Sequence, residues 1–215
     1  MITSIKLAQA LNAKLCHDFA GSIGSIDNCA SLINSVNNLT KEKSIELIQA
    51  SSNKLINYLK FYRHLYSISH DNDEISIEEI KILSDKFLGS RNYHIKLEFS
   101  TVLFTNINTN ISKVIMGLVI LSADNLMKEG TIKIEIKIND SSYNIKVIAS
   151  GKKIKPGGSL SDIISGKNPI DDLNTHNANE YYIYYLAKEL GYTLYINQSA
   201  NMIEYRCVAD GDHKY

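Results

Sequence analysis

Residues 15–28 read LCHDFAGSIGSIDN and place an ionisable pair, His17 and Asp18, shortly before two glycines, Gly21 and Gly24. A neutral imidazole is a competent nucleophile near physiological pH, because its unperturbed pKa is about 6.5. Such a side chain can carry a phosphoryl group as a covalent phosphoramidate. A glycine inside a helix lowers its stability by about 1 kcal/mol relative to alanine, so the two glycines call for an explanation.

The segment around His17 has the periodicity of an amphipathic helix. Its apolar residues recur every three or four positions: Ala8, Leu11, Leu15, Phe19, Ile23, Ile26, Ala30 and Ile33. On a helical wheel His17 falls almost opposite this stripe, beside small residues: Ala10, Ala13, Gly21, Gly24, Ser31 and Ser35. A solvated face usually carries Glu, Lys and Arg. A helix face with such small side chains indicates a docking surface for a partner protein. The alternative, an ordinary surface histidine, stays open on periodicity alone.

A second helix is predicted after the break at residues 37–40, with Thr40 as its cap. Its apolar stripe is Ile45, Ile48, Ser52, Leu55, Leu59, Tyr62 and Tyr66. If the chain turns near residues 38–40, the residues level with His17 are 60–64, which include Lys60, Arg63 and an outward-facing rival acceptor, His64. A cation there can steady a phosphoryl group or pair with an acidic partner. The alternative is a solvated rim over a core of aromatic residues.

These patterns give two predicted domains, a helical hairpin over residues 1–70 and a second domain over 75–210. The polar run SHDNDE, residues 69–74, reads as the linker. A lone hairpin cannot bury both apolar stripes well. A symmetric dimer would bury them in a four-helix bundle, and we favour it over packing of the hairpin on its own chain.

The second domain is predicted to be α+β, a two-layer sandwich with helices on one face of a sheet. Ser76 and Glu79 form a capping box that opens a short helix to about residue 88. Helices are also expected over 111–129 and 178–190, the latter closed by Gly191. Strands are expected over 93–99, 131–139, 143–149, 192–197 and 202–208. The segment GKKIKPGGS, from residue 151, reads as a flexible surface loop, because it lacks the spacing of a phosphate-binding loop.

Bulk composition excludes several classes of protein. The formal net charge is zero, with 23 basic and 23 acidic residues, which gives no general attraction to nucleic acid or to a membrane surface. The longest apolar run is too short to span a bilayer, and the first fifteen residues lack the features of a signal peptide, so we expect a cytoplasmic protein. The three isolated cysteines, Cys16, Cys29 and Cys207, read as small buried apolar residues.

LCHDFAGSIGSIDN resembles the phosphoacceptor box of histidine kinases and, more closely, that of the ChpT family of alphaproteobacterial histidine phosphotransferases. The matching positions are Leu15, Cys16, His17, Asp18, Gly24 and Asn28, while Ser22 replaces the family's proline. The second half resembles a Bergerat-type ATPase domain of kinases with its nucleotide site lost. Leu118 and Ser122 stand where a kinase has two asparagines, and Ala149 where it has the adenine-reading aspartate.

The resemblance implies a phosphorelay protein that passes a phosphoryl group between response-regulator receiver domains, including that of a hybrid histidine kinase, without autophosphorylation from ATP. His17 would be the acceptor, and Asp18 would orient its ring. Receivers would dock on Ala13, Lys14, Gly21, Gly24, Arg63 and His64. No cofactor or metal is expected on this chain, because the receiver would bring Mg²⁺. The rival interpretations are a non-catalytic dimeric scaffold that binds receivers and an active histidine kinase.

Overall fold

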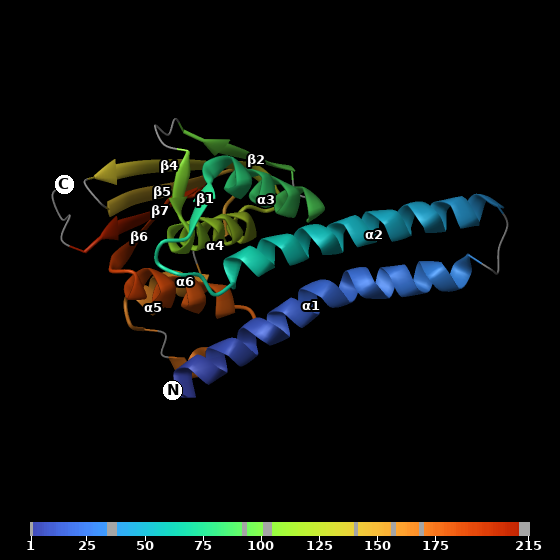
Figure 1. The fold of residues 1–215 in the computed structure, drawn as a ribbon, viewed down its shortest axis with the longest axis horizontal. Coiled ribbons are helices and arrows are strands. Elements are labelled where there is room, and N and C mark those ends of the chain that lie inside the picture. The colour runs from blue at the N-terminus through green and yellow to red at the C-terminus, as the bar shows by residue number, and fades with distance from the viewer. Residues whose placement is uncertain are drawn as a thin grey trace.

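The computed structural model describes residues 2–33, 38–91, 94–100, 105–139, 142–155, 158–167 and 170–210. Two long helices, α1 (Ile2–Leu32) and α2 (Asn38–Leu65), lie side by side as a hairpin that projects from a second, α+β unit (Figure 1). The second helix therefore begins at Asn38, two residues before the predicted cap at Thr40. None of the described helices is long and apolar enough to cross a membrane.

The second unit is built on a five-stranded sheet in the order β2-β4-β5-β7-β6. Its strands are β2 (His94–Phe99), β4 (Glu129–Asn139), β5 (Ser142–Ser150), β6 (Tyr192–Gln198) and β7 (Met202–Ala209). Strands β2 and β4 are parallel, and the other neighbours are antiparallel. The predicted hairpin of β4 and β5 is confirmed.

Helices α3 (Ile77–Ser90), α4 (Thr109–Asn125) and α6 (Ala178–Glu189) pack on this sheet, and the shorter α5 (Gly158–Ile164) lies beside α6 (Figure 1). Strand residues alternate accordingly: Ile132, Ile134 and Ile136 are buried, whereas Lys133 and Glu135 between them form an ion pair nearer the solvent. The α+β class, with a helical hairpin followed by a two-layer sandwich, is confirmed.

The structure corrects two local expectations and adds one small sheet. Helix α4 spans Thr109–Asn125 rather than 111–129, because Leu126 turns into an extended conformation and forms a β-bridge with Ile154. That bridge, and α5 beginning at Gly158, also show that the segment from residue 151 is not simply a flexible loop. Two three-residue strands, β1 (Glu74–Ser76) and β3 (Asn106–Asn108), form a small sheet that the pattern did not predict.

The hairpin is fastened to the sandwich at its base. Phe61 of α2 stacks on Phe87 of α3 with ring centroids 4.1 Å apart. The Tyr182 hydroxyl of α6 donates to the Leu65 carbonyl at 2.7 Å. Buried Lys113 of α4 donates from Nζ to the carbonyl of Ser67, just after α2, at 2.7 Å. The polar linker expected over 69–74 is also tied to α4, because the Ser69 hydroxyl donates to Oδ1 of Asn110 at 2.7 Å.

Candidate functional site

His17 lies on the outer side of α1, and its side chain is 88% exposed. Its Nδ1 atom lies 3.4 Å from Oδ1 of Asp18. A carboxylate only accepts hydrogen bonds, so in the neutral ring this contact favours the tautomer in which Nδ1 carries the proton. The lone pair is then on Nε2. The arrangement presents a nucleophilic nitrogen on a helix surface.

Asp18 itself is held from the second helix. Its Oδ2 atom accepts a hydrogen bond from the Tyr62 hydroxyl at 2.6 Å, and Nζ of Lys14 lies 3.9 Å from the same oxygen. Burial and the neighbouring Asp18 charge raise the pKa of Tyr62, so the phenol remains a donor at physiological pH. The contact confirms that residues 60–64 are level with His17. From the sequence we expected Tyr62 only as a core aromatic residue. Its place on the apolar stripe of the second helix, among the residues opposite His17, was the one indication that it could reach Asp18.

The two glycines have no packing role inside the described part of the chain. A Cβ atom built on Gly21 or on Gly24 would have no heavy atom within 4 Å. Ala13 and Gly21 are exposed, and Gly24 is half-buried. Around His17, the outer face of α1 therefore lacks bulky side chains at these positions and is open to an approaching protein.

Ser22, at the position of the family's proline, is 3% exposed, and its Oγ has no hydrogen-bond partner among the described residues. Helix α1 nevertheless bends partway along its length (Figure 1). Gly-Ser pairs commonly accompany helix bends, and α1 contains Gly21-Ser22 and Gly24-Ser25. The bend therefore does not require the proline.

The predicted cations divide into two groups. Lys60 and Arg63 are exposed on α2. His64, by contrast, is not outward-facing: its Nε2 lies 2.7 Å from Oγ of Ser112 on α4. Burial and the charge of Lys113 lower the pKa of His64. This correction arises because the last turns of α2 pack against the sandwich, and we leave His64 out of the docking surface proposed below.

The cysteine prediction is correct for two of the three residues. Cys29 and Cys207 are buried, but Cys16 is exposed. Cys16 directly precedes His17 on the solvent-facing part of α1. The exposure follows from the same helix geometry that brings the histidine to the surface.

The positions that resemble a degenerate nucleotide site lie in packed core. Leu118, Ser122 and Ala149 are all fully buried. Next to them, α4 and α6 approach so closely that a Cβ atom on Gly117 would lie 2.5 Å from Cγ1 of Ile183. The tyrosine-bearing helix α6 therefore fills space against α4.

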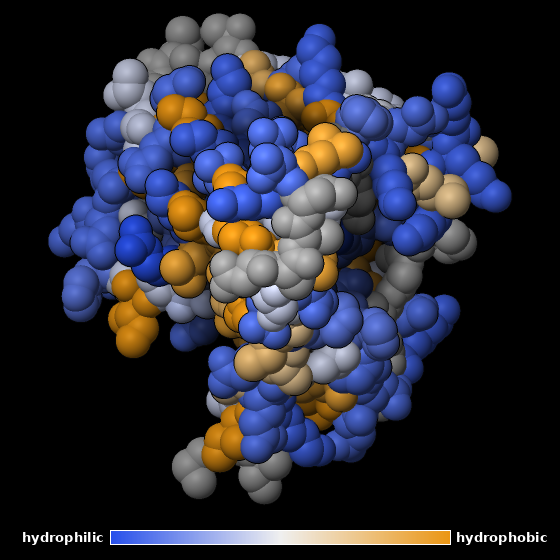
Figure 2. All heavy atoms as spheres, turned by 90° about the vertical axis from the view of Figure 1, so that its right-hand side faces the viewer, coloured by the Kyte–Doolittle hydropathy of each residue, from blue (hydrophilic) through white to orange (hydrophobic). Residues whose placement is uncertain are grey.

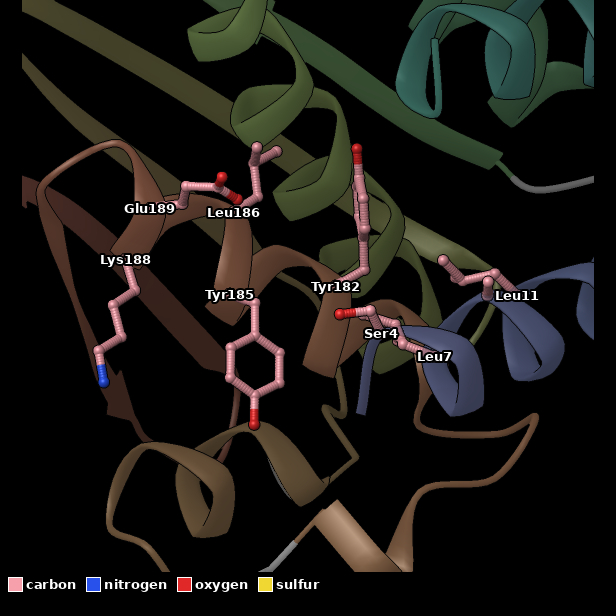
Figure 3. Close-up of a pocket in the computed structure, with 9 residues that line it drawn as sticks. Ser4, Leu7, Leu11, Tyr182, Tyr185, Leu186, Lys188 and Glu189 are labelled. Carbon is pink, nitrogen blue, oxygen red and sulfur yellow. The ribbon is translucent and has the colours of Figure 1, made fainter. Parts of the chain in front are cut away.

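An apolar groove lies between the start of α1 and α6 (Figure 3). It has a volume of about 620 Å³, and its lining includes Leu7, Leu11, Tyr185 and Leu186. The Tyr182 hydroxyl points away from Leu7 and Ser4, consistent with its bond to α2 (Figure 3). Leu11 precedes His17 by six residues, about 9 Å along the helix axis, so the groove and the histidine are separate features.

Residues 77–202 match the family described as histidine phosphotransferase C-terminal domain. The match spans more than half of the chain, and the chain belongs to this family of histidine phosphotransferases. The expected membership of the histidine phosphotransferases is thereby confirmed, by residues outside the 15–28 segment that first suggested it.

Comparison with individual proteins gives alignments over most of this chain. The protein phosphotransferase ChpT of Brucella abortus (strain 2308) is 19% identical over 203 residues, which are 94% of this chain and 95% of that protein. A bacterial phosphotransferase solved at 1.7 Å aligns with a TM-score of 0.81 and 19% identity, covering 94% of this chain and 96% of that one. The histidine kinase AdeS of Acinetobacter baumannii aligns with a TM-score of 0.46 and 10% identity over 91% of this chain and 98% of that one.

Proposed function

We propose that this histidine phosphotransferase relays a phosphoryl group between response-regulator receiver domains, with His17 as the carrier. The observation that carries the proposal is the exposed His17 ring, held at Nδ1 by Asp18, on a helix face cleared by Gly21 and Gly24. Exposure lets an incoming active site reach Nε2. The open face lets the surrounding protein surface approach the helix.

The transfer needs only the histidine and the phosphorylated receiver as reactants. The Nε2 lone pair attacks the phosphorus of an aspartyl phosphate on the donor receiver. The P–N bond forms, the P–O bond breaks, and the receiver carboxylate leaves. The ring, still protonated at Nδ1, gains positive charge, which the Asp18 carboxylate stabilises. The reverse step on a second receiver transfers the group onward.

Positioning and charge neutralisation supply most of the catalysis in phosphoryl transfer. In this proposal Mg²⁺ belongs to the receiver, as does the receiver's own cationic residue. This chain contributes the rigid histidine and the docking face of Ala13, Lys14, Gly21 and Gly24. Arg63, exposed on α2, would pair with acidic residues around the receiver's phosphorylation site.

We also propose that the chain takes no phosphoryl group from ATP. The burial of Leu118, Ser122 and Ala149 supports this, since none of these side chains can ligate Mg²⁺ or read adenine from within packed core. The close contact of Ile183 with Gly117 supports it further.

A homodimer through the hairpin completes the proposal. Several large apolar side chains of α1 and α2 are exposed in the single chain: Ile5, Ile23, Leu32, Leu39, Ile45, Leu47, Ile56 and Leu59. Figure 2 views the molecule from the side toward which the hairpin projects and shows apolar side chains at the surface among polar ones. Pairing two hairpins in a four-helix bundle would bury such a surface.

The test is a transfer assay with receiver domains from the organism that encodes this chain. Each receiver is phosphorylated, mixed with the chain, and followed for acid-labile label on the chain. We expect label from at least one receiver and none from ATP alone. Binding without label would favour the non-catalytic scaffold, and label from ATP would favour the kinase.

A further inference from the structure

We infer that Tyr62, on the helix opposite His17, is a positioning residue for phosphoryl transfer, because its buried hydroxyl fixes the carboxylate that orients the His17 ring. The inference rests on the proposed function and deepens it. Tyr62 contacts neither the ring nor the incoming phosphoryl group. It acts through Asp18.

The Asp18 carboxylate needs a restraint from outside its own helix to face the His17 ring. Asp18 is adjacent to His17 in sequence, and side chains at neighbouring helix positions do not naturally face each other. Without a second restraint the Asp18 carboxylate would have several staggered rotamers open to it. The 2.6 Å hydrogen bond from Tyr62 anchors Oδ2, which leaves Oδ1 directed to Nδ1 of His17 at 3.4 Å. One carboxylate thus links the two helices to the ring.

Tyr62 is itself held rigidly by its surroundings. The residue is 4% exposed, and its ring contacts aromatic rings of both units: Phe19, Tyr58, Phe61, Tyr66 and Phe87. Phe87 belongs to α3 of the sandwich, with its ring centroid 5.6 Å from that of Tyr62. The hydroxyl is therefore held in place by packing that does not depend on Asp18.

The position of the Asp18 carboxylate affects the chemistry of the His17 ring. A neutral imidazole exchanges between two tautomers, and only the form protonated at Nδ1 presents a lone pair on Nε2. A fixed Asp18 favours that form and stabilises the ring charge that develops during transfer. Lys14, at 3.9 Å, is too distant to replace the hydroxyl as a hydrogen-bond donor.

The chain offers a matched control. Tyr66 follows the last residue of α2, four residues after Tyr62, and stacks on Tyr62 with ring centroids 5.6 Å apart. Its hydroxyl, however, donates to Oδ1 of Asn179 at 2.7 Å and not to Asp18. Tyr62→Phe and Tyr66→Phe therefore each remove one hydroxyl from the same aromatic cluster and keep the ring. Only the first removes the restraint on Asp18.

The experiment compares the full-length wild type with both variants. Two-bond ¹H–¹⁵N spectra report the tautomer of His17, assigned by its loss in His17→Gln, and single-turnover assays report the transfer rate from a phosphorylated receiver. We expect Tyr62→Phe to shift His17 toward the Nε2-protonated tautomer and to slow transfer about 10-fold, the effect of weakening one charge-assisted hydrogen bond. Tyr66→Phe should change neither readout.

A wild-type tautomer and rate in Tyr62→Phe would overturn the inference and leave the proposed function intact. Equal effects in both variants would also overturn it, because a general loosening of the aromatic cluster would explain them. If wild-type His17 accepts no label, the proposed function fails, while the tautomer spectra still decide whether Tyr62 positions the ring.

Discussion

The two glycines beside His17 give a prediction in which stability and activity change in opposite directions. A Cβ atom at Gly21 or at Gly24 meets no heavy atom within 4 Å, so alanine introduces no clash in the chain itself. Replacing a glycine inside a helix by alanine stabilises the helix by about 1 kcal/mol. The double variant Gly21→Ala/Gly24→Ala should therefore gain about 2 kcal/mol. For a chain of this size that is a rise in Tm of about 4–8 °C.

The same two methyl groups project into the space that the proposed receiver occupies. We expect the double variant to transfer phosphoryl groups more slowly and to bind receivers more weakly than the wild type, although it is more stable. The assays are thermal unfolding, receiver binding by calorimetry, and single-turnover transfer. Gly89→Ala is the matched control, because Gly89 is also a helical glycine with open space at its Cβ position, but on α3. It should leave transfer unchanged. Undiminished binding and transfer in the stabilised double variant would refute the docking explanation for the glycines.

Two further predictions concern the packed base of the molecule. Gly117→Ala should lower the free energy of unfolding, measured with urea, by about 1–3 kcal/mol, because its Cβ would lie 2.5 Å from Cγ1 of buried Ile183. An unchanged midpoint of the urea unfolding curve would contradict the close packing of α4 on α6. His64, whose pKa is lowered by burial and by Lys113, stabilises the fold while neutral, so its contribution is present above the unfolded-state pKa and is lost as pH falls through the folded-state pKa. Unfolding free energies measured from pH 8 to pH 5 should fall less steeply for His64→Gln than for the wild type, and parallel curves would contradict this assignment.

The sequence predicted those parts of the fold whose signals are local. The N-cap predicted at Ser76 is present, with the Ser76 hydroxyl accepting from the Glu79 backbone amide. Gly191 has a positive φ of 76° just after α6, as expected for the residue that ends a helix. Strands long enough to alternate were also identified. The three-residue strands β1 and β3 were missed, because a strand that short shows no period.

Contacts between elements were harder to predict. The predicted hairpin correctly placed residues 60–64 of α2 opposite His17. It did not show that the final turns of α2 also pack on α4 and α6. That second contact turns His64 toward Ser112 and places the Tyr66 hydroxyl on Asn179. The bond from Tyr62 to Asp18 depends on how the two helices are rotated about their axes. Periodicity in one helix at a time does not contain that information.

Locating the label after transfer from a phosphorylated receiver decides whether His17 carries the phosphoryl group. The wild type, His17→Gln and His64→Gln are compared under single-turnover conditions, with the labelled residue identified by peptide mapping at alkaline pH. We expect acid-labile label on His17 in the wild type, the same label in His64→Gln, and none in His17→Gln. Label of wild-type intensity on His17→Gln would contradict it.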